Sequence, residues 1–183
     1  MLILGLDPGM AETGWGIIRR LKTNPSSAKR KSENKNGFET VSYGCIKTFV
    51  GQSLPQRLLV LRNELQQIIR KYEPDCLAIE QLFFGRNSKT AMIVGLARGV
   101  TMVTAAEKDI PVFEYQGLRV KLNLAGHGRC SKRGMQSAVR RILNLRSLPR
   151  PQHASDALAV AIYHVLEKEK LLGEKDVGNK KKK

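Results

Sequence analysis

The sequence predicts one α/β domain in which a mixed β-sheet is covered by helices on both faces. Two observations lead to this prediction. The first third of the chain contains strand-like apolar runs separated by turn residues, which is typical of an antiparallel meander. From residue 55 onward, stretches with helical periodicity alternate with short apolar runs, which is typical of βαβ units and their parallel strands.

The first elements follow from turn residues and apolar runs. Residues 2–6 form a short apolar run that fits a buried strand, and the turn-rich segment DPGMAETG follows it. Residues 15–20 are expected to pair back as the second strand of a hairpin, and residues 38–49 to form a third strand. Residues 21–37 are polar, basic and rich in chain breakers, so we interpret them as a long loop insertion.

The later elements show a change of period. Residues 55–72 carry Leu and Ile at helical spacing and predict an amphipathic helix, and residues 76–79 fit a strand buried on both faces. Residues 88–108 predict a helix that is apolar nearly all round, so it is either buried in the domain or shared between the core and a subunit interface. We further expect a strand at 112–115, a helical turn at 116–123, a basic helix at 132–144 and a last helix at 152–170.

Length and composition exclude several classes of protein. A chain of 183 residues with 42% hydrophobic residues can bury a core without disulfides. The apolar N-terminus carries Asp7 and lacks a basic leader, and no run approaches the roughly 20 apolar residues of a membrane-spanning helix. The three cysteines (Cys45, Cys76 and Cys130) are scattered, which favours reduced thiols and a cytoplasmic location without membrane attachment.

The charge is strongly positive and unevenly distributed. The formal net charge is +16, which favours a polyanionic partner. Residues 116–150 contain nine basic residues and no acidic one. The end of the chain, 171–183, closes with four lysines, and we expect a disordered tail there beyond a domain of residues 1–170. The central basic stretch is therefore the better candidate for specific contacts with phosphates.

Three acidic residues occur where apolar residues would be expected. Asp7 ends the first apolar strand, Glu80 ends the run CLAI, and Asp156 lies within the apolar helix ASDALAVAI. Unpartnered buried acids are costly, so their convergence on a shared cation is the simplest joint explanation. Oxygen ligands suit Mg²⁺, and acids that hold a cation beside a basic surface are what a metal-dependent nuclease needs.

Each acid also has a structural alternative. Asp7 precedes Pro and Gly and is suited to an Asx turn. Glu80 has a possible partner in a buried arginine such as Arg98, and Asp156 is placed to interact with a helix N-terminus. The sequence leaves these alternatives open for each residue taken singly.

His153 lies three residues before Asp156, so both project from one face of the last helix. A histidine at this place is suited to ligate a metal or to act as a general base near neutral pH, and the alternative is an exposed residue at a helix start. His127 and His164 have no such context, and we interpret them as structural or exposed.

Two aromatic residues, Phe83 and Phe84, follow Glu80 in the segment EQLFFGRN. Such residues either plug the core or stack on nucleic-acid bases. Arg86 and its basic and polar neighbours favour a contact with nucleic acid.

Four blocks of the sequence, taken together, closely resemble the bacterial RuvC Holliday-junction resolvases. They run from about residue 2 to residue 164 and read ILGLDPGMAETGWGII, PDCLAIEQLFFGRNSKTAMIVGLARGV, PVFEYQGLRVKLNLAGHGRCSK and PQHASDALAVAI. The DPG segment is weak by itself. The EQ pair followed by an aromatic residue, the ARG segment and the pattern from Val120 to Lys132 are specific.

The resemblance implies a ribonuclease-H-like fold and a homodimer that cuts four-way DNA junctions by paired symmetric nicks, in cooperation with a branch-migration complex of the RuvA–RuvB type. It implies Mg²⁺, two ions per site, with Mn²⁺ as a substitute. Asp7, Glu80 and Asp156 match the catalytic, metal-binding acids, and His153 stands where many relatives have an aspartate. Expected DNA contacts are Phe83, Phe84, Arg86, Lys121, Arg129, Lys132 and Arg133.

Two other functions compete with this one. A related nuclease acting on RNA would share an early aspartate at a strand end but not the EQLFF and QHASD blocks. A junction-binding protein without cleavage would be expected to lack one of the acids, and all three are present.

Overall fold

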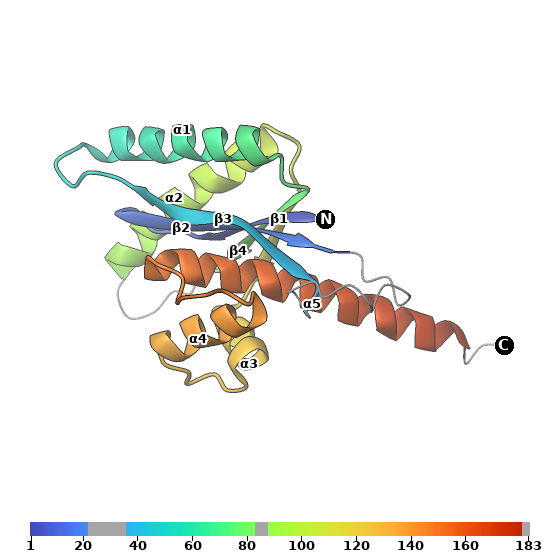
Figure 1. Cartoon of the computed structure of the whole chain (residues 1–183). Helices are drawn as coiled ribbons and strands as arrows, with labels where there is room; N and C mark the ends of the chain where they lie inside the picture. Colours follow the sequence, from blue (N-terminus) through green and yellow to red (C-terminus); the bar gives the residue numbers. More distant parts are fainter. Residues whose placement is uncertain (22–35, 83–87, 181–183) are drawn as a thin grey trace.

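The computed structural model describes residues 1–21, 36–82 and 88–180, and Figure 1 shows its layers. Most of the expected insertion at 21–37 therefore lies outside the described residues. The elements occur in the order β1 (Leu2–Asp7), β2 (Glu12–Arg20), β3 (Phe38–Lys47), α1 (Leu54–Tyr72), β4 (Cys76–Glu80), α2 (Ser88–Ala106), β5 (Val112–Tyr115), α3 (Gly117–Ala125), α4 (Lys132–Ile142) and α5 (Gln152–Lys180).

Five strands of the described chain form one mixed sheet in the order β3-β2-β1-β4-β5. β1, β2 and β3 are an antiparallel meander, and β1, β4 and β5 run parallel. Asp7 faces Gly14 across the first hairpin, while Leu6 is paired with Ile79 on the other side. The predicted mixed sheet is thus confirmed, and its register brings the ends of β1 and β4 together.

Helices cover both faces of this sheet. α1 and α2 lie on one face, and α5 lies on the other with α3 and α4 beneath it (Figure 1). The core on the α1 side includes Leu4, Leu77 and Leu65, and the core on the α5 side includes Ile3 and Leu158. Alternate residues of β1 therefore serve opposite layers, as the period of a strand requires.

α5 lies very close to the sheet because glycines replace side chains beneath it. A Cβ atom at Gly5 would overlap the backbone carbonyl of Ala157, and one at Gly14 would overlap that of His153. The facing residues of the helix, such as Ala154 and Ala161, are small and fully buried. This close contact sets the height of the first turns of α5 above the end of β1.

α2 is neither fully buried nor fully exposed. Ala97, Thr101 and Ala105 are buried against the domain, whereas Met92 and Val103 are 64% and 58% exposed. Complete burial, the first placement expected for this helix, is therefore wrong, and a subunit interface on its exposed face stays a prediction.

α5 continues to Lys180, ten residues beyond the end expected from the sequence. The domain limit at residue 170 and the disorder of the tail stay predictions, and residues 181–183 lie outside the described chain. None of the described helices is both long and apolar enough to cross a membrane.

Candidate active site

The first component of the site is Asp7, at the carboxyl end of β1. The strand is buried up to Leu6, and the chain then turns at Pro8 and Gly9, so the Asp7 side chain emerges at the rim of the sheet with 21% of its surface exposed. Nδ1–H of His153 donates a hydrogen bond of 2.7 Å to Oδ2 of Asp7. The recorded partner of Asp7 is therefore a residue 146 positions away, and not the backbone of an Asx turn.

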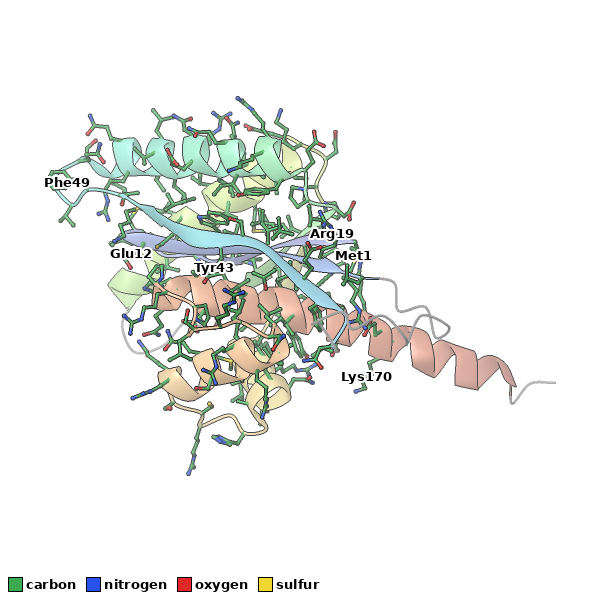
Figure 2. The ribbon with its side chains drawn as sticks, viewed as in Figure 1. Met1, Glu12, Arg19, Tyr43, Phe49 and Lys170 are labelled. Atoms are coloured by element: carbon green, nitrogen blue, oxygen red, sulfur yellow. The ribbon has the colours of Figure 1, made fainter. Side chains whose placement is uncertain are left out.

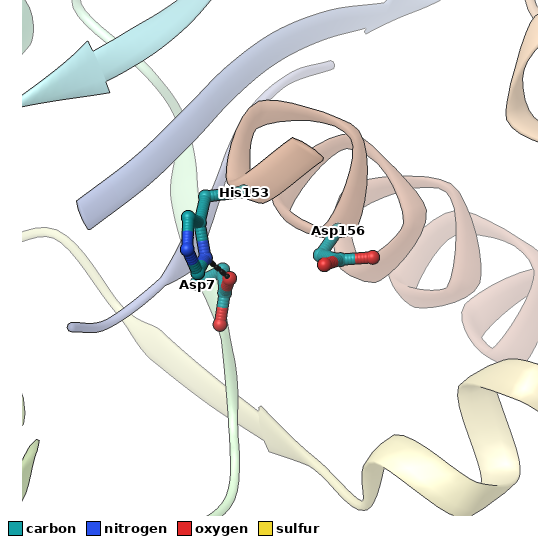
Figure 3. Close-up of side chains that lie close together, drawn as sticks. All are labelled: Asp7, His153 and Asp156. Atoms are coloured by element: carbon teal, nitrogen blue, oxygen red, sulfur yellow. Dashed lines mark hydrogen bonds and ion pairs between the residues drawn. The ribbon is translucent and has the colours of Figure 1, made fainter. Parts of the chain in front are cut away.

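The second component is the first turn of α5, which carries His153 and Asp156. Figure 3 shows the imidazole directed at Asp7, and the Asp156 carboxylate beside them on the following turn. One ligand atom from each of Asp7, His153 and Asp156 lies within 4.8 Å of the others. The spacing of three residues predicted a shared face for His153 and Asp156, and the glycine contacts beneath α5 bring that face to Asp7.

Glu80 adds a third carboxylate from the neighbouring strand. It follows Ile79, which is paired in register beside Leu6, and it lines a hollow of about 270 Å³ together with Asp7, Gln81 and Val94. It is not part of the group of ligand atoms that lie within 4.8 Å of one another. The alternative pairing of Glu80 with Arg98 is wrong, because Arg98 forms an ion pair with Glu114 of β5 instead.

Burial and the charge of Asp7 raise the proton affinity of the two other carboxylates. Burial, and then the charge of Asp7, raise the pKa of Glu80 to about 7. The pKa of Asp156 is also raised, first by burial and then by Asp7. The hydrogen bond to Asp7 raises the pKa of His153 above its usual value. The site thus holds more negative charge than the protein groups around it neutralise.

This donor set fits a divalent cation. Carboxylate oxygens suit Mg²⁺, and one imidazole nitrogen beside them is better suited to Mn²⁺. A bound cation would relieve the repulsion and the burial cost that raise the pKa values of Glu80 and Asp156. Asp7, His153 and Asp156 therefore lie close enough together to hold such a metal, with Glu80 beside them.

The whole of this site lies within a region that matches a known family. A family model described as "Crossover junction endodeoxyribonuclease RuvC" matches residues 3–164. The chain belongs to the RuvC family.

Individual relatives agree with this assignment. The chain is 43% identical over 164 residues to the RuvC crossover junction endodeoxyribonuclease of Ruminiclostridium cellulolyticum, covering 90% of this chain and 91% of the relative. It resembles the solved structure of Thermus thermophilus RuvC with a TM-score of 0.78 and 30% identity over 92% of this chain and 96% of that one. A structure of T. thermophilus RuvC in complex with Holliday junction substrate also gives a TM-score of 0.78 at 30% identity, covering 90% and 93%. These matches agree with the ribonuclease-H-like sheet expected from the sequence.

The described basic residues that are expected to contact DNA lie on α3, on α4 and in the loop between these helices. Lys121 of α3 lowers the pKa of both Glu80 and Asp156, so its ammonium group acts on the acidic cluster directly. Arg129, in the loop before α4, and Lys132 and Arg133, at the start of α4, are exposed. Phe83, Phe84 and Arg86 lie outside the described residues.

Two neighbours of the site were not found from the sequence. Oε2 of Glu12 lies 4.0 Å from Nε2 of His153, and Nε2 of Gln152 donates a hydrogen bond of 3.5 Å to Oδ2 of Asp156. The separation of four residues between Gln152 and Asp156 was a usable helical signal. Glu12 offered none, because only the packing of α5 on the first hairpin brings it to the imidazole.

Proposed function

We propose that this chain binds four-way DNA junctions and resolves them by hydrolysing phosphodiester bonds in opposing strands, with paired symmetric nicks. The observation that supports this most directly is the group of Asp7, His153 and Asp156 at one rim of a strongly basic RuvC chain, with Glu80 beside it. Basic groups attract the phosphate backbone, and hydrolysis takes place where that backbone meets the acidic cluster.

We assign the cluster to two Mg²⁺ ions, for which Mn²⁺ is expected to substitute. When bound, such ions lower the pKa of water and stabilise charge on the attacking and leaving oxygens. Asp7 lies between α5 and β4 and is the residue best placed to serve both sides of the site. Glu80 and Asp156 complete the donor set on either side of Asp7.

His153 acts at the imidazole, either as a metal ligand or as the group that accepts a proton from the attacking water. Asp7 orients the ring through the hydrogen bond at Nδ1, and this leaves Nε2 free to act on the side where Glu12 lies. The pH and metal dependence of a His153 variant separates the two roles, as set out in the Discussion.

The proposed DNA contacts are Lys121, which acts on the acidic cluster, and Arg129, Lys132 and Arg133 around the start of α4, together with Phe83, Phe84 and Arg86 from the segment after Glu80. A branch-migration complex of the RuvA–RuvB type is the expected partner on the same junction, and a cytoplasmic location stays a prediction.

We also propose a homodimer whose contact includes the exposed face of α2. Met92, Leu96 and Val103 recur at helical spacing and are 64%, 40% and 58% exposed. An exposed apolar stripe of this kind favours a protein–protein contact, and a two-fold axis would supply one active site for each of two opposing strands.

The dimer contact is tested by light scattering, in which Leu96→Glu should convert the dimer to a monomer. The matched change Leu59→Glu, at an exposed position of α1, should remain dimeric. A Leu96→Glu variant that remains dimeric would show that the exposed face of α2 is not the dimer contact.

The activity is tested with a synthetic four-way junction and a linear duplex of the same sequence, each with and without Mg²⁺. We expect symmetric nicks in the junction alone and only in the presence of metal. Each of three single substitutions should abolish nicking and keep junction binding: Asp7→Asn, Glu80→Gln and Asp156→Asn. The control Glu64→Gln, at an exposed position of α1, should nick at the rate of the parent. Junction binding without nicking by the unaltered chain would instead indicate a non-catalytic binding protein.

A further inference from the structure

A large basic hollow lies along α4, on a part of the molecule that the catalytic cluster does not use. It has a volume of about 740 Å³ and lies between the end of α3, the loop before α4, α4 itself and the turn that follows. Arg140, Arg141 and Arg146 line it, together with His127. All four side chains are exposed, so the hollow is open to a large ligand.

Four arginines elsewhere in the structure are paired with carboxylates, unlike the three that line the hollow. Arg19, Arg20, Arg62 and Arg98 each form an ion pair with a carboxylate. Within the described part of the chain, no ion pair is recorded for the three arginines of the hollow, and residues 116–150 contain no acid that could supply one locally. Their positive charge is therefore available to an anion from outside.

The lining favours phosphate groups over an apolar peptide segment. Leu145 is a large apolar side chain in the lining and is half-buried, and the alanines that line the hollow, such as the buried Ala138, are small. A hot spot for a peptide would need a deep apolar pocket for an anchor side chain, whereas a row of exposed guanidinium groups matches phosphate oxygens.

The position of α4 makes the hollow part of a longer basic track. α4 starts with Lys132 and Arg133 and is 11 residues long, about 16 Å. At its far end, Arg141 also lines a second hollow of about 450 Å³ with Arg20 and Leu166. Glu12, which faces the imidazole of His153, and Arg20, which lines the second hollow, lie at opposite ends of β2. Figure 2 shows this separation for Glu12 and Arg19, the neighbour of Arg20, so the track leads away from the cluster.

We propose that the α4 hollow, defined by Arg140, Arg141 and Arg146, binds the phosphodiester backbone of one duplex arm of the junction, away from the crossover. The length of α4 corresponds to about five base pairs of duplex rise. The inference rests on the proposed function for the nature of the DNA, and adds that this chain holds an arm as well as the crossover. The hollow contributes affinity for long arms and takes no part in the chemical step.

The test compares two triple variants that lose the same charge. Arg140→Gln/Arg141→Gln/Arg146→Gln removes the hollow's cations. Arg70→Gln/Lys71→Gln/Lys108→Gln removes three exposed cations from the face of the sheet covered by α1 and α2. Thermal melting of both variants first establishes that each is folded. Binding is then measured on junctions with arms of about 6 and about 20 base pairs over a range of salt concentrations.

The parent and the control variant should bind long-armed junctions at least tenfold more tightly than short-armed ones. The hollow variant should lose most of that gain, and its salt slope on long arms should fall by about 0.9 for each lost phosphate contact, roughly 2–3 in total. On short arms it should match the control, and its nicking rate at saturating junction should be unchanged.

Equal behaviour of the two triple variants on long arms would overturn the proposal. So would equal losses on short and long arms, since the hollow would then contact the crossover. If the parent nicks no junction at all, the proposed function fails, yet the dependence of binding on arm length still reports on the hollow by itself.

Discussion

The backbone carbonyl of His153 lies directly against Gly14, where the structure has no room for a Cβ atom. Gly14 faces Asp7 across the hairpin, so the same pair of strands holds Asp7 and supports the first turn of α5. The glycine therefore determines how close His153 and Asp156 come to Asp7, although its own side chain takes no part in the chemistry.

Gly14→Ala should consequently damage both the fold and the site. The added methyl group must push the start of α5 away from the sheet, and overpacking of this kind costs roughly 1–3 kcal/mol. We expect a Tm several degrees lower and a nicking rate reduced at least tenfold. Thermal melting and junction cleavage measure the two effects, and a variant with the parent's Tm and rate would show that α5 adjusts without loss.

Glu80→Gln should stabilise the protein while abolishing its activity. The folded chain binds the Glu80 proton up to pH 7, whereas the unfolded chain releases it near pH 4.5, so this group lowers stability as pH rises through that window. Because part of the carboxylate remains in solvent, we expect the variant to gain about 1–2 kcal/mol at pH 8 and nothing below pH 4.5.

The measurement is urea unfolding in the presence of a chelator at pH 4 and pH 8. Glu39→Gln is the matched control, since Glu39 is an exposed partner of Arg19 and its loss should change stability by no more than about 1 kcal/mol at either pH. A Glu80 variant that is less stable than the parent at pH 8 would mean that the carboxylate has a structural partner.

His153→Asp should separate the two roles of the histidine. If His153 is a metal ligand, the parent should gain more from Mn²⁺ over Mg²⁺ than the variant does, because imidazole nitrogen suits Mn²⁺. If it accepts the proton of water, protonation of the imidazole should stop nicking on the acid side. Because the pKa of His153 is raised, the nicking rate of the parent should fall already above about pH 6.5, and the variant should stay active at lower pH.

Nicking rates against pH in each metal distinguish these outcomes. Because protons and metal compete for the same groups, raising the metal concentration should move the acid limb of the parent to lower pH. Identical profiles for parent and variant in both metals would reduce His153 to a residue at a helix start.

His164 gives the opposite pH dependence of stability to that of Glu80. It is fully buried, hydrogen-bonded to Tyr115 (2.7 Å) and to the thiol of Cys76 (3.3 Å), and burial lowers its pKa to about 4. The unfolded chain binds this proton below about pH 6.5 and the folded chain does not, so stability falls as pH drops from 6.5 to 4.

His164→Gln should therefore be less stable than the parent at pH 7, because the buried ring is lost, but should lose less stability on going to pH 5. Urea unfolding at both pH values measures this. His127→Gln, at an exposed position, is the control and should lose as much free energy of unfolding between pH 7 and pH 5 as the parent does. If the His164 variant loses as much free energy of unfolding as the parent between pH 7 and pH 5, the ring is protonated in the folded protein.

Local pattern was sufficient for most of the elements. The strand β5 was predicted at its observed limits, and α1 and α4 within two residues, because apolar periodicity is a property of neighbouring residues. β2 begins three residues before its predicted start, since pairing to β1 extends it to Glu12. α5 extends ten residues beyond its predicted end, through a segment (171–180) that contains two glycines and no clear apolar periodicity.

The site was predicted unevenly for the same reason. An acid at the end of an apolar run, or within one, is recognised from its neighbours along the chain, so Asp7, Glu80 and Asp156 could be selected from the sequence. The partner of Arg98 could not be, because the choice between Glu80 and Glu114 depends on how α2 packs against adjacent parallel strands.

The sequence by itself determined which segments become strands and helices, which acids lie at the ends of buried runs, and that the surface is basic, because these depend on residue type and spacing along the chain. Only the tertiary structure decided that Asp7 meets His153 across 146 residues, that Glu12 faces the same imidazole, and that three arginines of α4 and its turn share one hollow. Those distances follow from sheet order and from the glycine-lined contact under α5, and both arise from packing between segments far apart in the chain.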